Sequence, residues 1–235
     1  HEGVQFPETR AYVDRVEWVT MADAQTAINA LQSGDIDFLE NPSFDMIPIL
    51  QKDKELHVQT LNKLGFQTIG RMNFLYPPFD NVKVRRAALM ALSQKPILDA
   101  LVGNPAYYKV CGAVFVCNTP LGSEADSAPI VKGDDLAEAK KLLAESGYDG
   151  TPVVLMAPGD VVTLKAQPIV AAQQLRDAGF KVDLQATDWQ TVVSRRASQK
   201  SPKEGGWNIF CTNWVAPDVM NPVANVMLNG KGKKG

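Results

Sequence analysis

The sequence has no apolar run of the roughly 18 residues that a membrane-spanning helix needs, and no basic segment leading into a short apolar core. We therefore expect neither a membrane span nor a signal peptide within these residues. An excess of one charge is also lacking, because 24 basic residues stand against 26 acidic ones among 235, for a formal net charge of -2. That balance does not attract nucleic acid or an anionic membrane, and we expect neither as a partner.

Catalytic motifs are scarce as well. Hydrolysis needs a nucleophile beside an oriented base, but the only histidines are His1 and His57, and no Gly-x-Ser-x-Gly or glycine-rich phosphate loop occurs. The cysteines lack the paired spacing of a zinc site, and Asp134-Asp135 is typical of a helix N-terminus rather than of a metal site. We therefore expect a binding protein without catalytic residues, bound metal or cofactor.

Only three cysteines are present. Cys111 and Cys117 flank a short apolar stretch close to Pro120, and we predict a local disulfide between them. In the chain-entropy model such a short loop contributes roughly 2–3 kcal/mol, and the bond implies an oxidising compartment. The alternative is that both are reduced and pack as small hydrophobic residues. Cys211 is left as a free, buried thiol.

The hydrophobic pattern alternates between the periods of strands and helices, which argues for an α/β fold. Residues 1–65 are expected to form β-α-β-α-β, followed by a strand, a series of helices around a long irregular stretch, and further strands. A loop rich in Pro and Asn is expected after the last strand, and residues 230–235 are expected to form a flexible basic tail. The expected strands are 16–20, 36–38, 57–61, 67–75, 153–156, 181–186 and 207–211. The expected helices are 23–33, 46–54, 81–92, 97–102, 134–147 and 164–178, and a further helix is capped by Asp188. A loop over 212–222 and a short helix ending near Leu228 follow.

A resemblance to a known family rests on three passages. The strand from Gln67 to Leu75 leads through Pro-Pro-Phe-Asp into Val-Lys-Val-Arg-Arg-Ala-Ala-Leu-Met-Ala-Leu-Ser. Ala-Leu-Gln-Ser-Gly-Asp-Ile-Asp-Phe precedes it, and the charged helix from Asp134 to Tyr148 follows. Over nearly all of Val13 to Leu228 the chain resembles the family 5 extracytoplasmic solute-binding proteins, the oligopeptide, dipeptide and nickel receptors of ABC importers.

The resemblance implies a type II periplasmic-binding-protein-like α/β fold, with one three-layer lobe and part of a second. Residues 1–66 would belong to lobe I and residues 67–235 to most of lobe II. The implied function is hinge closure around a small solute or peptide, followed by docking of this monomeric, periplasmic receptor on a membrane permease. Because the chain starts at His1 without a Met, we expect a piece of a longer, exported protein.

The resemblance also implies ligand-binding residues. In the oligopeptide receptors, a tryptophan that opens a helix, an arginine later in that helix, and a tryptophan and an aspartate in a following loop line the cleft. Trp189, Arg196 and Trp214 match these positions, and Asn213 adjoins the last of them. Indoles offer broad contact, a guanidinium takes a carboxylate and a carboxylate holds an amine, so the set suits a zwitterionic ligand.

Two departures from the family pattern qualify this set. Asp218 matches only if Pro217 is a one-residue insertion, and Cys211 stands where the oligopeptide receptors carry a further ligand-facing arginine. A peptide ligand depends on these two positions, whereas solute binding itself does not. Each residue also has a structural alternative: core packing for both tryptophans, a solvated helix face for Arg195 and a turn for Asp218.

Two other functions remain open at this stage. One is a sensory module in which the same fold presents its ligand to a signalling partner. The other is a cysteine-dependent redox or hydrolytic enzyme that uses Cys211 or the pair Cys111 and Cys117.

Overall fold

The computed structural model describes residues 12–21, 23–125, 127, 131, 135–223 and 225. The chain divides into two compact units, His1–Val58 and Gln59–Gly235. The predicted tail and the short helix ending near Leu228 lie outside the described residues. The predicted assignment of residues to lobes, with its boundary at 66, stays a prediction.

The first unit contains the helix α1, Ala24–Ser33, followed by the 3-10 helix η1, Phe44–Met46, and the short helix α2, Ile47–Leu50. Helix α1 begins where predicted, because the Asp23 carboxylate accepts a hydrogen bond from the Thr26 amide at 2.9 Å. It ends at Gly34, whose φ of 79° is easily reached only by a residue without a Cβ.

The three strands predicted within the first 65 residues do not form in the described part of the chain. This prediction was wrong, although the alternation that suggested it is present. A strand needs a neighbour to pair its backbone groups, and no strand is paired with residues 16–20, 36–38 or 57–61. Trp18 accordingly remains 91% exposed.

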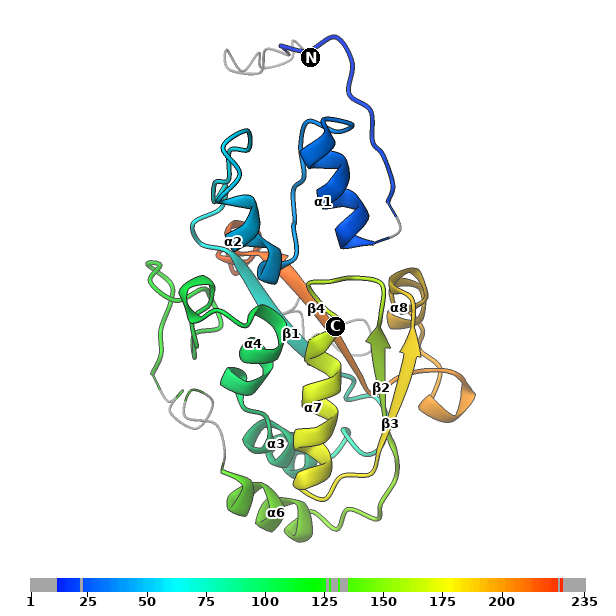
Figure 1. The fold of residues 1–235 in the computed structure, drawn as a ribbon. Helices are drawn as coiled ribbons and strands as arrows, with labels where there is room; N and C mark the ends of the chain where they lie inside the picture. Colours follow the sequence, from blue (N-terminus) through cyan, green and yellow to red (C-terminus); the bar gives the residue numbers. More distant parts are fainter. Residues whose placement is uncertain are drawn as a thin grey trace, which may run out of the picture. The chain divides into compact units, whose positions relative to one another are not determined.

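The second unit is built around a four-stranded sheet in the order β1-β4-β2-β3 (Figure 1). Strand β4 runs parallel to β2, which is parallel to β3, while β1 is antiparallel to β4 at the edge. All four strands were predicted, although β4 begins later and continues further than expected. The strands are β1 Phe66–Met72, β2 Val153–Pro158, β3 Val182–Thr187 and β4 Ile209–Val215.

Helices lie on both faces of this sheet, as the predicted three-layer α/β architecture requires. Alternate residues of a strand face opposite sides, so Leu155 and Ile209 pack toward α7 while Met156 and Phe210 pack toward α8. The helices and 3-10 helices are α3 Val82–Ala91, α4 Gln94–Val102, η2 Pro105–Tyr107, α6 Leu136–Glu145, α7 Ala166–Asp177, α8 Trp189–Arg196, η3 Pro202–Glu204 and α9 Ala216–Val219.

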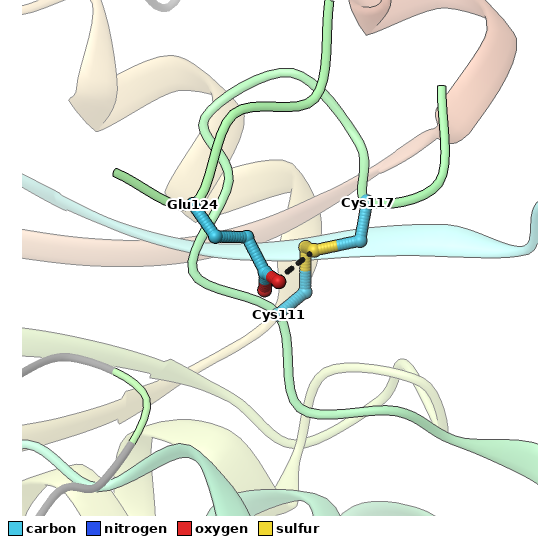
Figure 2. Close-up of side chains that lie close together, drawn as sticks. All are labelled: Cys111, Cys117 and Glu124. Carbon is cyan, nitrogen blue, oxygen red and sulfur yellow. Dashed lines mark hydrogen bonds between the residues drawn. A yellow bond between two sulfur atoms is a disulfide. The ribbon is translucent and has the colours of Figure 1, made fainter. Parts of the chain in front are cut away.

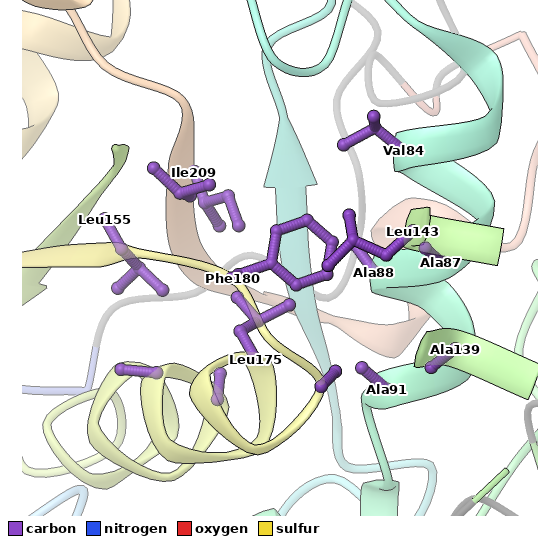
Figure 3. Packing of buried hydrophobic residues seen from close by; sticks show 14 of the residues in the cluster. Val84, Ala87, Ala88, Ala91, Ala139, Leu143, Leu155, Leu175, Phe180 and Ile209 are labelled. Carbon is purple, nitrogen blue, oxygen red and sulfur yellow. The ribbon is translucent and has the colours of Figure 1, made fainter. Parts of the chain in front are cut away.

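The main core lies between the sheet and the helices α3, α6 and α7 (Figure 3). Helix α3 presents a row of small buried side chains, including Ala87, Ala88 and Ala91, which lets α6 pack closely against it. Phe180, only 3% exposed, fills the space beside Leu175 and Leu143. This burial of apolar surface is what holds the helical layer on the sheet.

The corner between β1 and α3 is tied to the sheet through Asn208, which is fully buried. Its side-chain carbonyl accepts a hydrogen bond from the Val154 amide at 2.9 Å, and its side-chain NH2 donates to the Pro77 carbonyl at 3.1 Å. Asn73 on the other side of the corner donates to the Trp207 carbonyl at 3.0 Å. The Pro-Pro corner is therefore fixed by a buried polar network as well as by its prolines.

Replacing Asn208 by Ala is expected to lower the free energy of unfolding by about 2–4 kcal/mol, because the buried Val154 amide and the partly buried Pro77 carbonyl lose their partner. Urea unfolding of the purified protein, followed by circular dichroism, measures this loss. The control is Gln190→Ala on the exposed face of α8, which should change the value by less than about 0.5 kcal/mol. Equal stabilities for both variants would contradict the structural role of Asn208.

Candidate functional site

Four of the predicted ligand-binding residues lie at or after the carboxyl ends of the parallel strands β3 and β4, namely Trp189, Asn213, Trp214 and Asp218, while Arg196 ends the helix α8. Trp189 follows β3 directly, separated from it only by Asp188. Pairing between β2 and β4 joins Leu155 to Ile209 and Met156 to Phe210, and Asn213 and Trp214 follow further along β4 toward its carboxyl end. Ligands of open α/β sheets bind outside the carboxyl ends of strands, and this edge is therefore the candidate site.

Two aspartates hold the first turn of α8 and with it Trp189. Asp188 caps the helix, as predicted, by accepting hydrogen bonds from the Thr191 hydroxyl at 2.7 Å and the Thr191 amide at 2.8 Å. Asp160, in the loop after β2, accepts from the Trp189 amide at 2.8 Å. The bonds from Thr191 lower the pKa of Asp188, so its contribution to stability is complete above the usual carboxylate range and is lost as the pH falls through the lowered value.

Trp189 and Arg196, two of the predicted residues, meet through an aromatic cluster. The guanidinium carbon of Arg196 lies 5.6 Å from the centre of the Trp189 ring and 5.9 Å from that of Phe210. Trp189 packs at the edge of the buried group formed by Met156, Val192, Trp207 and Phe210. Among the described residues no carboxylate forms a salt bridge with Arg196, so its charge is held by aromatic faces and remains available to an anion.

Arg195, next in sequence, has a different role. Its side-chain Nε donates to the Gly205 carbonyl at 3.2 Å, and Nη2 donates to the Gly206 carbonyl at 2.8 Å. Arg195 is half-buried, and the alternative of a solvated helix face was therefore wrong for it. This arginine fixes the loop that follows α8, whereas Arg196 lies against two aromatic rings.

Trp214 and Asn213 lie on β4 rather than in the predicted loop, because the strand runs to Val215 and α9 follows it directly. The strand continues because β1 pairs with it to its end, with Gln67 opposite Trp214 and Phe66 opposite Val215. Trp214 is half-buried and packs at the edge of a cluster formed by Val116, Ala216 and Val219, together with Met220. It shares its face of the sheet with Phe210, four residues earlier in the same strand.

Asn213 and Asp218 are placed apart from these aromatic residues. Asn213 points to the opposite face of β4 from Trp214, and its side-chain NH2 donates to the Thr163 carbonyl at 3.4 Å. Asp218 is exposed in the first turn of α9, where Pro217 occupies an early position that needs no amide donor. The turn suggested as its alternative role is thus a short helix. Within the described residues, no hydrogen bond or ion pair joins Asp218 to another predicted ligand residue.

The predicted disulfide between Cys111 and Cys117 is present, with Cα atoms 5.9 Å apart. Glu124 points at it, and its carboxylate oxygen lies 3.2 Å from the sulfur of Cys117 (Figure 2). Among the described residues, these three form the one group with the side-chain types and spacing of a metal site. Because both sulfurs are bonded to each other, neither is a thiolate that could bind a metal.

Cys211 is the free cysteine that was predicted, and it is 1% exposed. Burial raises the pKa of its thiol to about 12, so the reactive thiolate is a negligible fraction at neutral pH. It lies on the opposite face of β4 from Trp214 and so offers the tryptophan side of the sheet neither charge nor a hydrogen bond. With the other two cysteines in a disulfide, none of the three is available as a nucleophile in this state.

A separate open hollow of about 330 Å³ lies at the C-terminal ends of α6 and α7. It is apolar, and none of the predicted ligand residues lines it. The residues around it are Lys140, Leu143, Ala144, Tyr148, Ala178 and Gly179.

In the part of the chain that the structure describes, no helix combines the length and apolar character needed to cross a bilayer.

Residues 6–235 match family 5 of the bacterial extracellular solute-binding proteins, in the region described as its middle part. The chain belongs to this family, as its sequence motifs predicted. Because the match extends over almost the whole chain, the resemblance noted at the Pro-Pro corner is part of a family relationship that includes both compact units.

Curated relatives carry the names of solute-binding proteins. The chain is 36% identical over 225 residues, 95% of its own length and 42% of the relative's, to a probable peptide ABC transporter periplasmic-binding protein of Sinorhizobium fredii, y4tO. It is 28% identical over 214 residues, 87% of its own length and 38% of the relative's, to the glutathione-binding protein GsiB of Escherichia coli K12. The chain thus spans about two fifths of the length of these relatives.

Solved structures support the type II fold. NikA of Staphylococcus aureus in complex with Ni(L-His)2 superposes with a TM-score of 0.68 at 16% identity, covering 88% of this chain and 42% of that one. DppA of Helicobacter pylori in complex with the peptide STSA gives 0.63 at 17% identity, covering 88% and 38%. At such low identity these likenesses concern the fold alone.

Sequence reasoning missed three residues that organise the site: Phe210, Asp160 and Gln67. Phe210 was seen only as part of a strand, although its spacing of four from Trp214 puts both rings on one face once β4 is known to reach Val215. Asp160 follows β2 after a single glycine, but nothing in the sequence indicates that it contacts the start of α8. Gln67 was overlooked because its importance depends on the register between β1 and β4.

Proposed function

We propose that this chain is the central part of the extracytoplasmic substrate-binding component of an ABC importer. The whole receptor captures a small, peptide-like solute between two lobes and delivers it to a membrane permease, working as a periplasmic monomer without catalysing a reaction. Family membership and the transport relatives support this proposal. Residues 1–66 are assigned to lobe I and residues 67–235 to lobe II, close to the division between Val58 and Gln59.

The observation that carries the proposal is the environment of Arg196. Its guanidinium lies over two aromatic rings, near the strand ends where a ligand is expected, and no described residue neutralises it. An anionic group of the solute, such as the C-terminal carboxylate of a peptide, can form a charge-assisted hydrogen bond there. Trp189 and Trp214 would supply apolar contact area, and Asp218 would receive an amine; Asn213, predicted for the same site, faces the other side of β4 and would act only beside Thr163.

A thermal-shift screen of the full-length receptor tests this function. The probes are trialanine, trialanine amide, glutathione and nickel bound to histidine, each compared with buffer alone. A ligand that binds only the native state stabilises it by about 2.7 kcal/mol at a hundred times its dissociation constant, which raises Tm measurably. We expect trialanine or glutathione to raise Tm and to change the tryptophan fluorescence.

The amidated peptide is the matched control, because it differs from trialanine only in the anionic group assigned to Arg196. It is expected to give a smaller shift than the free acid. If neither peptide raises Tm at millimolar concentration, the proposal of a peptide-like solute is wrong; a shift with the nickel chelate alone would transfer the function to metal uptake.

A further inference from the structure

The loop closed by the disulfide, Cys111–Cys117, is attached to β1 and α4 by two glutamines. Gln94 on α4 binds the backbone of Cys111 twice, accepting from its amide at 2.9 Å and donating to its carbonyl at 2.7 Å. Gln67 on β1 donates through its side-chain NH2 to the carbonyl of Val114 at 3.0 Å and to that of Ala113 at 3.3 Å. The disulfide loop is therefore bound to α4 at its start and to β1 at its middle.

These attachments bring the disulfide loop to Trp214. Gln67 is the direct cross-strand partner of Trp214, so both side chains stand on the same face of the sheet. Val116, 8% exposed, belongs to the buried cluster against which the Trp214 ring packs. The loop is thus connected to the indole by two routes: its backbone binds Gln67, which stands beside Trp214, and its Val116 side chain belongs to the cluster against which the indole packs.

The backbone of the disulfide loop needs to be held in place. Val116 has a φ of 22° and Asn118 one of 63°, and a β-branched residue such as valine rarely adopts a positive φ. Conformations of this kind cost on the order of 1 kcal/mol or more and persist only where the surroundings enforce them. Asn118 adopts its value readily because asparagine favours the left-handed region, but Val116 is poised to relax if the covalent link between Cys111 and Cys117 is absent.

We propose that the disulfide loop is a positioning element of the solute site, which holds the Trp214 indole in place through Val116 and Gln67. This inference rests on the proposed function, in which Trp214 contacts the solute. Opening the link requires two electrons and two protons per disulfide, supplied by a dithiol reductant, and gives two thiols. The indole then loses its fixed packing against Val116. An indole that must be ordered during binding gives weaker affinity.

The carboxylate of Glu124 lies beside this link. Its carboxylate oxygen accepts a hydrogen bond from the Gly112 amide at 3.2 Å and lies at the same distance from the sulfur of Cys117. A negative charge beside the sulfur repels an attacking thiolate and disfavours the thiolate that must leave. The arrangement fits a permanent structural link, so substitution is a better test than mild reduction.

The test uses three variants of the full-length receptor: Cys111→Ser with Cys117→Ser, Val116→Ala, and Val114→Ala as the matched control. Val114 lies in the same loop, but its side chain is 55% exposed and is not part of the cluster around Trp214. Incorporated 5-fluorotryptophan makes each indole visible by fluorine NMR, and Trp214→Phe identifies the resonance of Trp214. Affinity is measured by calorimetry with trialanine and glutathione.

The Trp214 resonance is expected to shift or broaden in the double serine variant and in Val116→Ala, while affinity falls about 3- to 10-fold, and Val114→Ala should match the wild type in both readouts. Val116→Ala keeps the disulfide, so the test stands even if the double variant fails to fold. An unmoved Trp214 resonance, or a moved resonance with unchanged affinity, overturns the inference. If the wild type binds neither probe, the proposed function has failed, and the resonance alone then decides whether the loop holds the indole.

Discussion

Replacing Arg196 by Ala is expected to weaken binding of trialanine to the full-length receptor by about 30- to 100-fold. A charge-assisted hydrogen bond contributes about 2–3 kcal/mol, and each 1.4 kcal/mol corresponds to a tenfold change in affinity. The Arg196 guanidinium lies over Trp189 and Phe210 without a carboxylate partner among the described residues, so its removal leaves the solute carboxylate unpaired. Isothermal titration calorimetry measures both dissociation constants.

A cycle with the amidated peptide isolates the charge. Trialanine amide lacks the carboxylate, so its affinity should be nearly the same for the wild type and Arg196→Ala. Arg86→Ala serves as the control for a lost positive charge, because Arg86 is exposed on α3 outside the candidate site. Equal losses for the acid and the amide would show that Arg196 acts through packing alone, and no loss for either would remove it from the site.

Phe180→Ala is expected to be the most destabilising single change in the core, lowering the free energy of unfolding by about 3–5 kcal/mol. The Phe180 ring is 3% exposed, with its centre 5.5 Å from that of Tyr148 and 6.4 Å from that of Phe79. Its removal leaves a cavity between the sheet and the helices α3, α6 and α7 (Figure 3). Urea unfolding monitored by circular dichroism measures the loss.

The matched control is Phe66→Ala, since Phe66 is 49% exposed at the start of β1 and leaves no enclosed cavity. That substitution should cost less than half as much as Phe180→Ala. A loss below about 1.5 kcal/mol for Phe180→Ala would mean that the core closes around the missing ring, contrary to the tight packing of its helices.

Elements whose signals are local were predicted well. The helix α8 begins after Asp188 because a carboxylate can cap its own helix. Strand β2 appears at an apolar run, and β3 where Val182 and Leu184 alternate with polar residues. The strands expected in residues 1–65 failed for the complementary reason, since alternation indicates only that a segment can pair. Whether it does so depends on a partner strand, which the described residues do not supply.

The candidate site shows the same division. Trp189, Arg196 and Trp214 could be selected by residue type and family resemblance, and the short spacing of Cys111 and Cys117 was enough to predict their disulfide. Two adjacent arginines give no indication that Arg195 anchors a loop while Arg196 faces two aromatic rings. The difference depends on where Gly205 and Phe210 lie against α8 in the folded chain.

The sequence by itself determined the family, the α/β alternation of the second unit, the absence of catalytic motifs and the caps of its helices, because each of these depends on residues close together in the chain. Only the tertiary structure decided that β4 continues to Val215, that Asn213 and Trp214 face opposite sides, and that the disulfide loop reaches Trp214. These features follow from pairing and packing between segments about 50 to 150 residues apart, and their geometry is set when the segments fold together.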